Sequence, residues 1–316
     1  MATKFAFPNL EEGCVIDYSY EVSSENLTTL RDWYFQEDIP IRASELQVEM
    51  PEWFNYLTLF NGQENLANTD TKRDFINTAG YQIPTTVSTY LATDVPALKE
   101  ESYITTMDDY RMRIRFQLHS IQIPGETYEE YLSNWEQVAE TLREHQYFGQ
   151  QYTKKRNYKK LLQAAEPQLV QAGTAAEKVS MTYYYLAKAM EWNEEHHLFS
   201  DTDLDDAFEK RTANSAELNM MLIALLREQG ITAHPMLVST RSSGKMVQHY
   251  PIVSQFNHAL AYVEIEGQSM LLDVGSTNRP MGIPRVESLN RAGWVLADDA
   301  AKWVNLPAPM SSDVTV

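Results

Sequence analysis

The sequence predicts an α+β protein whose N-terminal part is rich in β-strands. Short runs of β-branched and aromatic residues, punctuated by Pro, Gly, Asn and Asp, fill residues 1–124. Apolar residues at helical spacing then replace them, and the chain finishes with a strand–turn–strand pattern. Runs of strands followed by runs of helices, without regular alternation, are typical of the α+β class.

The length of 316 residues is enough for two domains. We place a β-rich domain at residues 1–124 and a second domain at residues 125–305, in which a buried helix packs on an antiparallel sheet. A tail or linker follows at residues 306–316. The chain enters a strand-like pattern almost at once, which predicts that the first domain is truncated at its start.

Composition and charge restrict the classes of partner. Hydrophobic residues are 43% and charged residues 22% of the chain, which is typical of a folded protein. The formal net charge of −18 would repel phosphates, so we expect no nucleic-acid partner and no anionic membrane surface. No run reaches the roughly 18 apolar residues of a membrane span. The start has no apolar signal core either, which leaves open that a signal peptide was removed.

The strand-like runs of the first domain carry two predictions. Cys14, the only cysteine, lies in the run 14–22, where a buried structural thiol is expected. Residues 110–121 alternate strictly, with Tyr110, Met112, Ile114, Phe116 and Leu118 on one face and three arginines on the other. The apolar face predicts a core strand. The arginine face is either solvated or a binding face for an acidic partner.

Helical patterns begin after residue 126. Thr127, with Glu130 three residues later, resembles a capping box, and Trp135, Val138 and Leu142 follow at helical spacing. This pattern predicts a helix over residues 127–148. Further helices are expected at residues 158–173, at 175–190 and, as a short capped helix, at 203–209.

A buried helix is predicted from residue 215 to residue 229. Asn214 is a suitable N-cap, Glu217 completes a capping box, and Gly230 ends the helix. Residues 220–226 are apolar on every side, so the helix is expected to be buried all round. The free N–H groups at its start suit an anion, a thiolate or an oxyanion. Ser215 would be the first residue of this helix.

A hairpin after the helix brings a histidine and a carboxylate together. If Glu266 and Gly267 form a two-residue turn, Leu260 lies opposite Asp273 and His258 lies diagonal to Asp273 on the same face. At that spacing the pair is either a base with its orienting group or a polar pair that stiffens the hairpin.

Ser215, His258 and Asp273 stand in the order nucleophile, base, orienter, and here the chain resembles the transglutaminase-like superfamily, which has a papain-like fold. The resemblance rests on "LLREQGI" at residues 225–231, on His258 and on Asp273. It places the catalytic cysteine of the family at Ser215. Longer phrases such as "FPNLEEGCVIDYSYEV", "NSAELNMMLIALLREQGI" and "MLLDVGSTNRPMGIP" are similar to one bacterial group.

The resemblance implies a β-sandwich-like N-terminal domain before the transglutaminase-like domain. Members of the group are usually exported or associated with the cell envelope, so a periplasmic or envelope location is expected. Many of them also carry Asn-Ser-Ala-Glu in place of the cysteine. Two departures from the active pattern matter: Ser215 replaces cysteine, and Leu260 stands where active members often have Trp. A hydroxyl does not ionise as a thiol does, so it would need His258 to take its proton during attack.

Two functions are therefore expected for the chain, with a third account of Ser215. The first is a non-catalytic protein that binds a peptide, protein or glycan partner in the envelope. The second is an acyl-transfer hydrolase, an amidase or peptidase, that uses Ser215, His258 and Asp273. In the third, Ser215 is an engineered replacement for cysteine. No cofactor is expected.

Two further segments carry residue types found in binding sites. His196 and His197 are adjacent and point apart, and "DTDLDD" lacks the Gly and Glu of a calcium loop, so no metal is expected. The polar loop at residues 239–251 either gates a ligand through Arg241 and Lys245 or is solvated.

Overall fold

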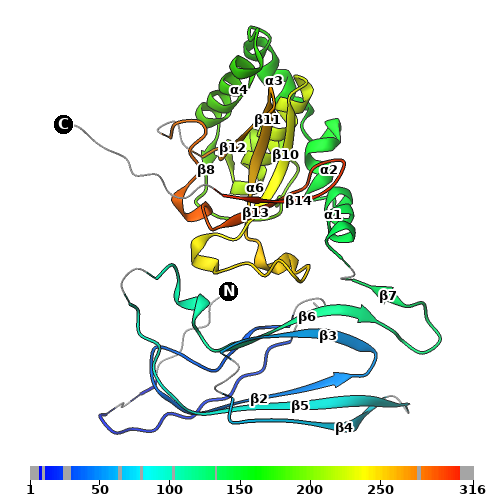
Figure 1. Ribbon diagram of the computed structural model, residues 1–316, viewed down its shortest axis with the longest axis vertical. Helices are drawn as coiled ribbons and strands as arrows, with labels where there is room; N and C mark the ends of the chain where they lie inside the picture. Colours follow the sequence, from blue (N-terminus) through cyan, green and yellow to red (C-terminus); the bar gives the residue numbers. More distant parts are fainter. Residues whose placement is uncertain are drawn as a thin grey trace.

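The computed structural model describes residues 7–8, 11–23, 30–62, 66–78, 81–101, 104–131, 134–275 and 279–306. Figure 1 shows a β-sandwich in the lower half of the molecule and a mixed helix–sheet domain in the upper half. Within the described part, no helix is both long and apolar enough to cross a bilayer. The α+β class is confirmed.

Two antiparallel sheets form the sandwich. One has the strand order β2-β5-β4, and the other has the order β1-β6-β3 with β7 added to β6. The strands are β1 (Trp33–Tyr34), β2 (Ile41–Pro51), β3 (Phe54–Asn61), β4 (Asn68–Thr78), β5 (Tyr81–Val95), β6 (Arg113–Ile121) and β7 (Glu129–Glu130). The sheets share a core to which Phe35, Tyr90 and Ile114 contribute. In sandwich packing of this kind, side chains from the inner faces of both sheets form the core.

Strand β6 follows the predicted alternation. Met112, Ile114, Phe116 and Leu118 are buried, whereas Tyr110 precedes the strand and is exposed, contrary to the prediction. Tyr110 lies outside because the chain turns at the short 3-10 helix η2 (Met107–Asp109) just before it.

The arginine face of β6 is paired within the domain. Asp32 lies 3.7 Å from an Nη1 of Arg113 and 3.3 Å from Nε of Arg115. Arg111 lies near Glu37 and Asp108, at 4.0 and 3.7 Å. These internal ion pairs leave less positive charge for an acidic partner than the sequence pattern indicates.

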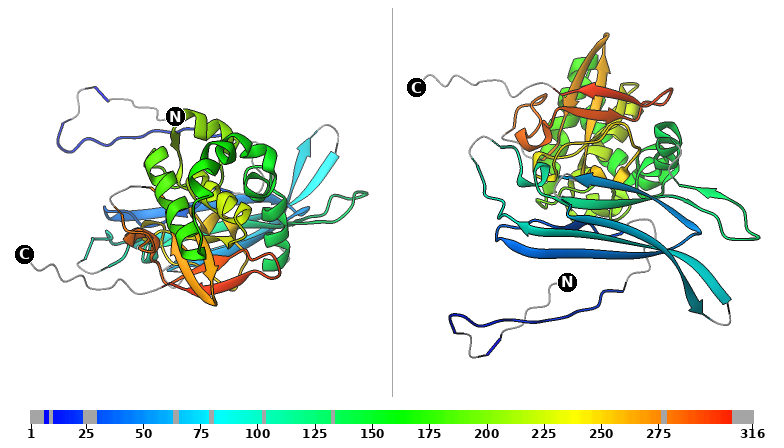
Figure 2. Two further views of the ribbon diagram at one scale, coloured as in Figure 1. Left: turned by 90° about the horizontal axis from the view of Figure 1, so that it is seen from above. Right: turned by 60° about the horizontal axis from the view of Figure 1, so that its bottom comes forward.

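The prediction for Cys14 is wrong. Residues 14–22 form no strand, and Cys14 is exposed rather than buried. Figure 2 shows this dark blue stretch running outside the sandwich. An alternating pattern makes a stable strand only beside a neighbouring strand, and in the described part of the chain none pairs with this stretch.

The helix predicted at residues 127–148 is also wrong in its first part. The chain continues along the sandwich there, because Glu129 and Glu130 pair with Ile121 and Ser120 of β6. The helix α1 (Trp135–Glu144) begins later, with Asn134 as the N-cap accepting a hydrogen bond from the Gln137 N–H. The segment therefore forms a strand pair with β6 instead of the helix start that its cap-like sequence predicts.

The upper domain packs helices on a five-stranded antiparallel sheet of order β12-β11-β10-β13-β14. The helices after α1 are α2 (Gly149–Thr153), α3 (Lys159–Leu169), α4 (Ala175–Ala189), α5 (Leu204–Lys210) and α6 (Ser215–Glu228). The sheet strands are β10 (Thr232–Val238), β11 (His258–Ile265), β12 (Gln268–Leu272), β13 (Ala292–Val295) and β14 (Lys302–Asn305). A short parallel pair, β8 (Glu191–Trp192) and β9 (Thr212–Ala213), leads into α6.

Helix α6 has the predicted ends and the predicted burial. Asn214 and Glu217 form a capping box, and every residue from Ser215 to Leu226 is buried. Gly230 has a φ of 75°, and the Ile231 N–H donates to the Leu226 carbonyl, which closes the helix in a Schellman motif. The helix is therefore capped at both ends and packed against β10 and β11, with Ser215 at its first position.

The segment between β10 and β11 joins the two domains. The Lys245 N–H donates to Asp109 Oδ1 at 2.6 Å, and the Thr106 hydroxyl donates to the Ser242 carbonyl at 3.2 Å. Figure 1 shows this segment in yellow between the sandwich and the upper domain. The Lys245 side chain is 44% exposed, in line with a solvated loop, although its N–H lies at the contact between the domains. Gating of a ligand by Arg241 and Lys245 stays a prediction.

Candidate functional site

Ser215 is held by the backbone of a preceding segment. The His197 N–H donates to Ser215 Oγ at 3.0 Å, and the His197 carbonyl lies 3.4 Å from the same oxygen as an acceptor. The Ser215 N–H donates to the Glu195 carbonyl at 3.1 Å. Ser215 has no exposed surface. Both the hydroxyl and the first N–H of helix α6 are therefore already used inside the protein.

His258 and Asp273 form the predicted pair. Ala261 lies opposite Leu272 and the turn falls at Glu266 and Gly267, which is the register expected from the sequence. His258 Nε2 lies 3.3 Å from Asp273 Oδ1, and both side chains are fully buried. The distance suits an ion pair, but the ring nitrogens of His258 make no well-aligned hydrogen bond within the described residues.

Asp273 has stronger partners than His258. Arg285 Nη1 donates to Asp273 Oδ1 at 3.0 Å, and Asn219 Nδ2 donates to the same oxygen at 3.2 Å. Arg279 Nη1 lies 3.6 Å from Asp273 Oδ2. Burial opposes the charge of Asp273, but His258, Arg285 and the hydrogen bonds outweigh it and hold the pKa of the carboxyl well below its ordinary value. The carboxylate is thus the centre of a buried charge network.

His196 packs against the ring of His258. The two rings meet edge to face with their centroids 4.8 Å apart, and His196 also contacts the Trp192 ring at 5.2 Å. Arg285 lies over the same Trp192 ring at 3.8 Å. Burial, followed by the neighbouring His258 and Arg285, lowers the pKa of His196 to about 4. At neutral pH His196 is an uncharged ring packed on His258.

Asn219 ties the helix to the hairpin. Its side chain donates to the carbonyls of Ser215 and Ala259, and its oxygen accepts the Val274 N–H at 3.0 Å. It lies one helical turn after Ser215, on the face that meets Asp273. This residue positions the first turn of α6 relative to Asp273.

The side chain of His197 points away from Ser215 toward an acidic pair. Ligand atoms of Glu195, His197 and Asp201 lie within 4.8 Å of one another, close enough to hold a metal ion. However, His197 Nδ1 lies 3.2 Å from Asn214 Nδ2. His197 Nδ1 also lies 3.4 Å from Asp201 Oδ1. A ring nitrogen that accepts the amide hydrogen bond has no lone pair left for a metal. The arrangement fits a hydrogen-bonded network better than a metal site, and the absence of a metal stays a prediction.

The structure thus joins His258 to Asp273 but gives Ser215 other partners. In the described part of the chain, Ser215 forms no hydrogen bond with His258. Sequence reasoning missed His196, Asn219 and Arg285. Asn219 had a signal, because it is polar within an otherwise apolar helix and four residues after Ser215. His196 and Arg285 arrive from loops whose paths no local pattern predicts.

Comparison with known proteins supports the fold of the upper domain. Residues 163–298 match the transglutaminase-like superfamily. A solved structure of a candidate protease from Parabacteroides distasonis has a TM-score of 0.58 and 11% identity, covering 88% of this chain and 48% of its own. A candidate cysteine protease from Cytophaga hutchinsonii has a TM-score of 0.32 and 12% identity, covering 90% of this chain and 95% of its own.

These likenesses concern the fold alone. A comparison with curated proteins gives no match. The chain spans about half the length of the Parabacteroides distasonis protein, and 11% identity carries no information about its chemistry.

Proposed function

We propose that the chain, whose residues 163–298 match the transglutaminase-like superfamily, is a non-catalytic protein of that type which binds a peptide, protein or glycan partner. The expected location in the cell envelope belongs to this proposal and rests on the sequence resemblance.

One observation carries the proposal, namely the enclosure of the Ser215 hydroxyl. Attack on an acyl group requires the nucleophile within about 3–3.5 Å of the reacting carbon. Ser215 has no exposed surface, and both hydrogen-bonding directions of its hydroxyl are directed to the His197 backbone. A substrate would have to displace this segment before it reached the oxygen.

The surroundings of His258 agree with an inert site. A serine nucleophile depends on a base that accepts its proton during attack. His196 lies on the His258 ring, and Asp273 is shared between His258, Arg285 and Asn219. Such a network stabilises the hairpin without any transfer of a proton.

A second candidate, acyl transfer by Ser215, His258 and Asp273, is favoured by one observation. Nδ1 of His258 is buried and has no hydrogen-bond partner within the described residues. A base awaiting a substrate or nucleophile would look the same. If the 193–203 segment moved, this nitrogen could receive the proton of Ser215.

Labelling with a serine-directed fluorophosphonate, read by intact mass, separates the two candidates. The parent protein, Ser215→Ala, His258→Ala and the buried-serine control Ser200→Ala are compared, with folding confirmed by circular dichroism. The proposal predicts no adduct on any of them. One adduct on the parent and on Ser200→Ala that is lost in Ser215→Ala and His258→Ala would establish the acyl-transfer enzyme instead.

A further inference from the structure

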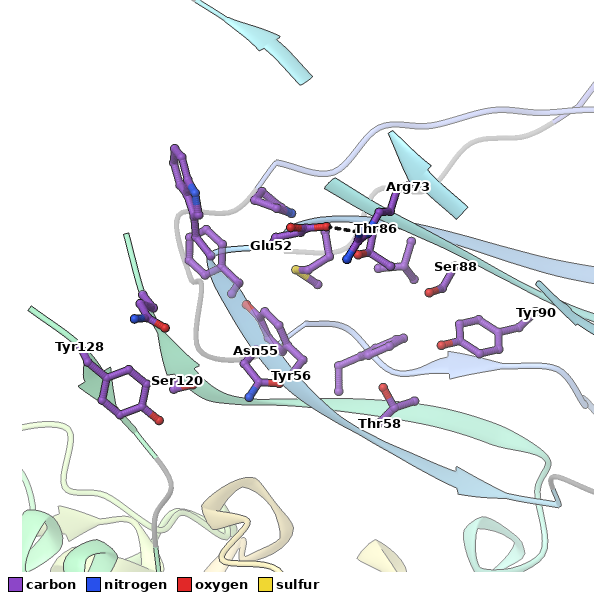
Figure 3. A pocket seen from close by; sticks show the side chains of 17 residues that line it. Glu52, Asn55, Tyr56, Thr58, Arg73, Thr86, Ser88, Tyr90, Ser120 and Tyr128 are labelled. Atoms are coloured by element: carbon purple, nitrogen blue, oxygen red, sulfur yellow. Dashed lines mark ion pairs between the residues drawn. The ribbon is translucent and has the colours of Figure 1, made fainter. Parts of the chain in front are cut away.

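The sandwich contains a cavity of about 610 Å³ at the end where β2 turns into β3. Its walls come from both sheets, and Figure 3 shows Thr58, Thr86, Ser88 and Tyr90 reaching into the space between them. This volume lies in the range of about 300–1,000 Å³ that is usual for small-molecule sites. The cavity is remote from Ser215, which lies in the other domain.

Along the strands that line the cavity, inward-facing positions change from apolar side chains to hydroxyl-bearing ones. On β5, Tyr90 and Ala92 fill the core, but Ser88 and Thr86 occupy the next positions on the same face. The apolar row of β6 likewise ends in Ser120 at the cavity. The sandwich is therefore packed at one end and open at the other.

Hydroxyl groups at inward-facing positions are unusual in a sheet that only has to pack, and Thr58, Thr86 and Ser88 hold such positions while remaining half-buried. A sandwich interior is normally filled by large apolar side chains from both sheets. Thr58 and Thr86 have no side-chain hydrogen-bond partner within the described residues, although they line the cavity. Places where a chain breaks the packing rule in this way are expected to be functional.

Aromatic rings complete the lining. Phe54, Tyr56, Tyr90 and Phe116 line the space, and Trp53 and Tyr128 join them at its edge. Burial raises the pKa of Tyr56 above its ordinary value of 10.0, and its phenol is uncharged at neutral pH in either case. The walls thus offer flat apolar faces and uncharged hydroxyl groups side by side.

The charge of the lining is balanced. Its charged members are Glu52 and Arg73, and they pair with each other, with Arg73 Nε 3.3 Å from Glu52 Oε1. Figure 3 shows this pair on one side of the cavity. An ionic ligand would be buried here without an unpaired opposite charge, which costs free energy. A neutral ligand does not carry that cost.

We propose that this cavity binds a neutral oligosaccharide. Sugar rings carry hydroxyl groups that match Thr58, Thr86, Ser88 and Ser120, and apolar C–H faces that match the aromatic rings. A lipid chain would leave the hydroxyls of Thr58 and Thr86 unpaired in an apolar contact, at a cost in affinity. The inference deepens the proposed binding role and rests on it for the kind of partner, but it does not depend on whether Ser215 is inert.

Isothermal titration of the whole chain with cellopentaose, maltopentaose, chitopentaose and mannopentaose tests the site. At least one of these should bind saturably. Thr58→Val and Thr86→Val should each weaken that binding about 2- to 10-fold, because each removes one hydrogen bond. Thr89→Val, on the opposite face of β5 from the cavity, is the matched control and should bind as the parent does.

A filling variant gives an independent readout. Ser88→Phe places a ring in the cavity and should abolish saccharide binding, with folding checked by its thermal transition. The proposal is overturned if none of the four saccharides binds, or if binding survives unchanged in Thr58→Val, Thr86→Val and a folded Ser88→Phe. Fluorophosphonate labelling does not enter this assay, so failure here is distinct from failure of the non-catalytic assignment.

Discussion

Asp273 shows how one buried carboxylate can hold several polar and charged groups together. It lies within reach of His258, Arg285, Arg279 and Asn219, and both of its oxygens have partners. Arg285 has a side chain that is almost wholly buried, so its charge depends on this carboxylate. Removing one member of a buried ion pair leaves the other uncompensated.

We expect Asp273→Asn to lower the free energy of unfolding by about 3–5 kcal/mol, because the Arg285 charge stays buried without its counterion. Urea unfolding at pH 7 measures the loss. Asp298→Asn is the control, since Asp298 pairs with Arg227 on the surface and should cost less than about 1 kcal/mol. Equal losses in the two variants would contradict the buried network.

His196 predicts a pH dependence of stability. Its pKa is lowered to about 4 from the ordinary 6.5, so the unfolded chain binds the proton more tightly than the folded protein does. The contribution of neutral His196 is therefore complete above pH 6.5 and is lost progressively as the pH falls toward 4.

His196→Phe retains a ring against His258 and removes the titration. Urea midpoints measured from pH 7 to pH 4 should fall less steeply for this variant than for the parent. Other groups titrate in the same range, so the difference between the two curves is the quantity to read. Identical slopes would mean that His196 is not enclosed as described.

At the scale of elements, local rules predicted the helix start and the hairpin that carry Ser215, His258 and Asp273. The cap at Asn214, the end of α6 at Gly230 and the turn at Glu266 and Gly267 depend on residues close in sequence, and all are confirmed. The register that brings His258 to Asp273 follows from that turn. The cap, the helix end and the turn could be predicted because no pairing with a distant segment replaces them.

Other elements depend on segments distant in sequence, so their structure could not be predicted from the local sequence. Thr127 has the sequence of a cap, yet its segment leads into β7, which pairs with β6. The run at Cys14 has the alternation of a strand but no strand beside it among the described residues. The position of His196 on His258 depends on a loop path, for which the sequence has no periodic signal.

Gly230 allows a quantitative check of the end of α6. Its φ of 75° is unfavourable for other residues, and an added Cβ would meet nothing within 4 Å, so strain in the backbone is the whole cost. Gly230→Ala should destabilise the protein by about 1 kcal/mol in urea unfolding. Gly173→Ala, where φ is not in this region, should change the stability by less. A reversed order would contradict the Schellman assignment.

At the scale of the whole molecule, the two domains are joined through polar contacts that include the buried side chain of Asp109. Asp109 has a side chain that is only 4% exposed, and it accepts the Lys245 N–H and lies 3.7 Å from Lys245 Nζ. The contact fixes the 239–257 segment, which ends just before His258. The contact with the sandwich therefore helps to fix the start of β11, the strand that carries His258.

Asp109→Ala should free this segment, because it leaves the Lys245 N–H without its partner at a cost of about 1–3 kcal/mol. Limited trypsin digestion should cut faster after Arg241 and Lys245 in this variant than in the parent. Asp108→Ala, whose side chain pairs with Arg111 nearer the surface, is the control. Unchanged cleavage in Asp109→Ala would contradict the role given to this contact.

The central claim is that the Ser215 hydroxyl is enclosed by the protein, and a cysteine placed at this position tests it most directly. The double variant Cys14→Ser, Ser215→Cys has a single thiol at the site, and the parent, with its exposed Cys14, gives the reference rate. Reaction with Ellman's reagent at pH 7 should be at least about 100-fold slower for the double variant when folded, and equal to the reference after unfolding, because the 193–203 segment covers the thiol. A folded double variant that reacts as fast as Cys14 would show an open site and contradict the account.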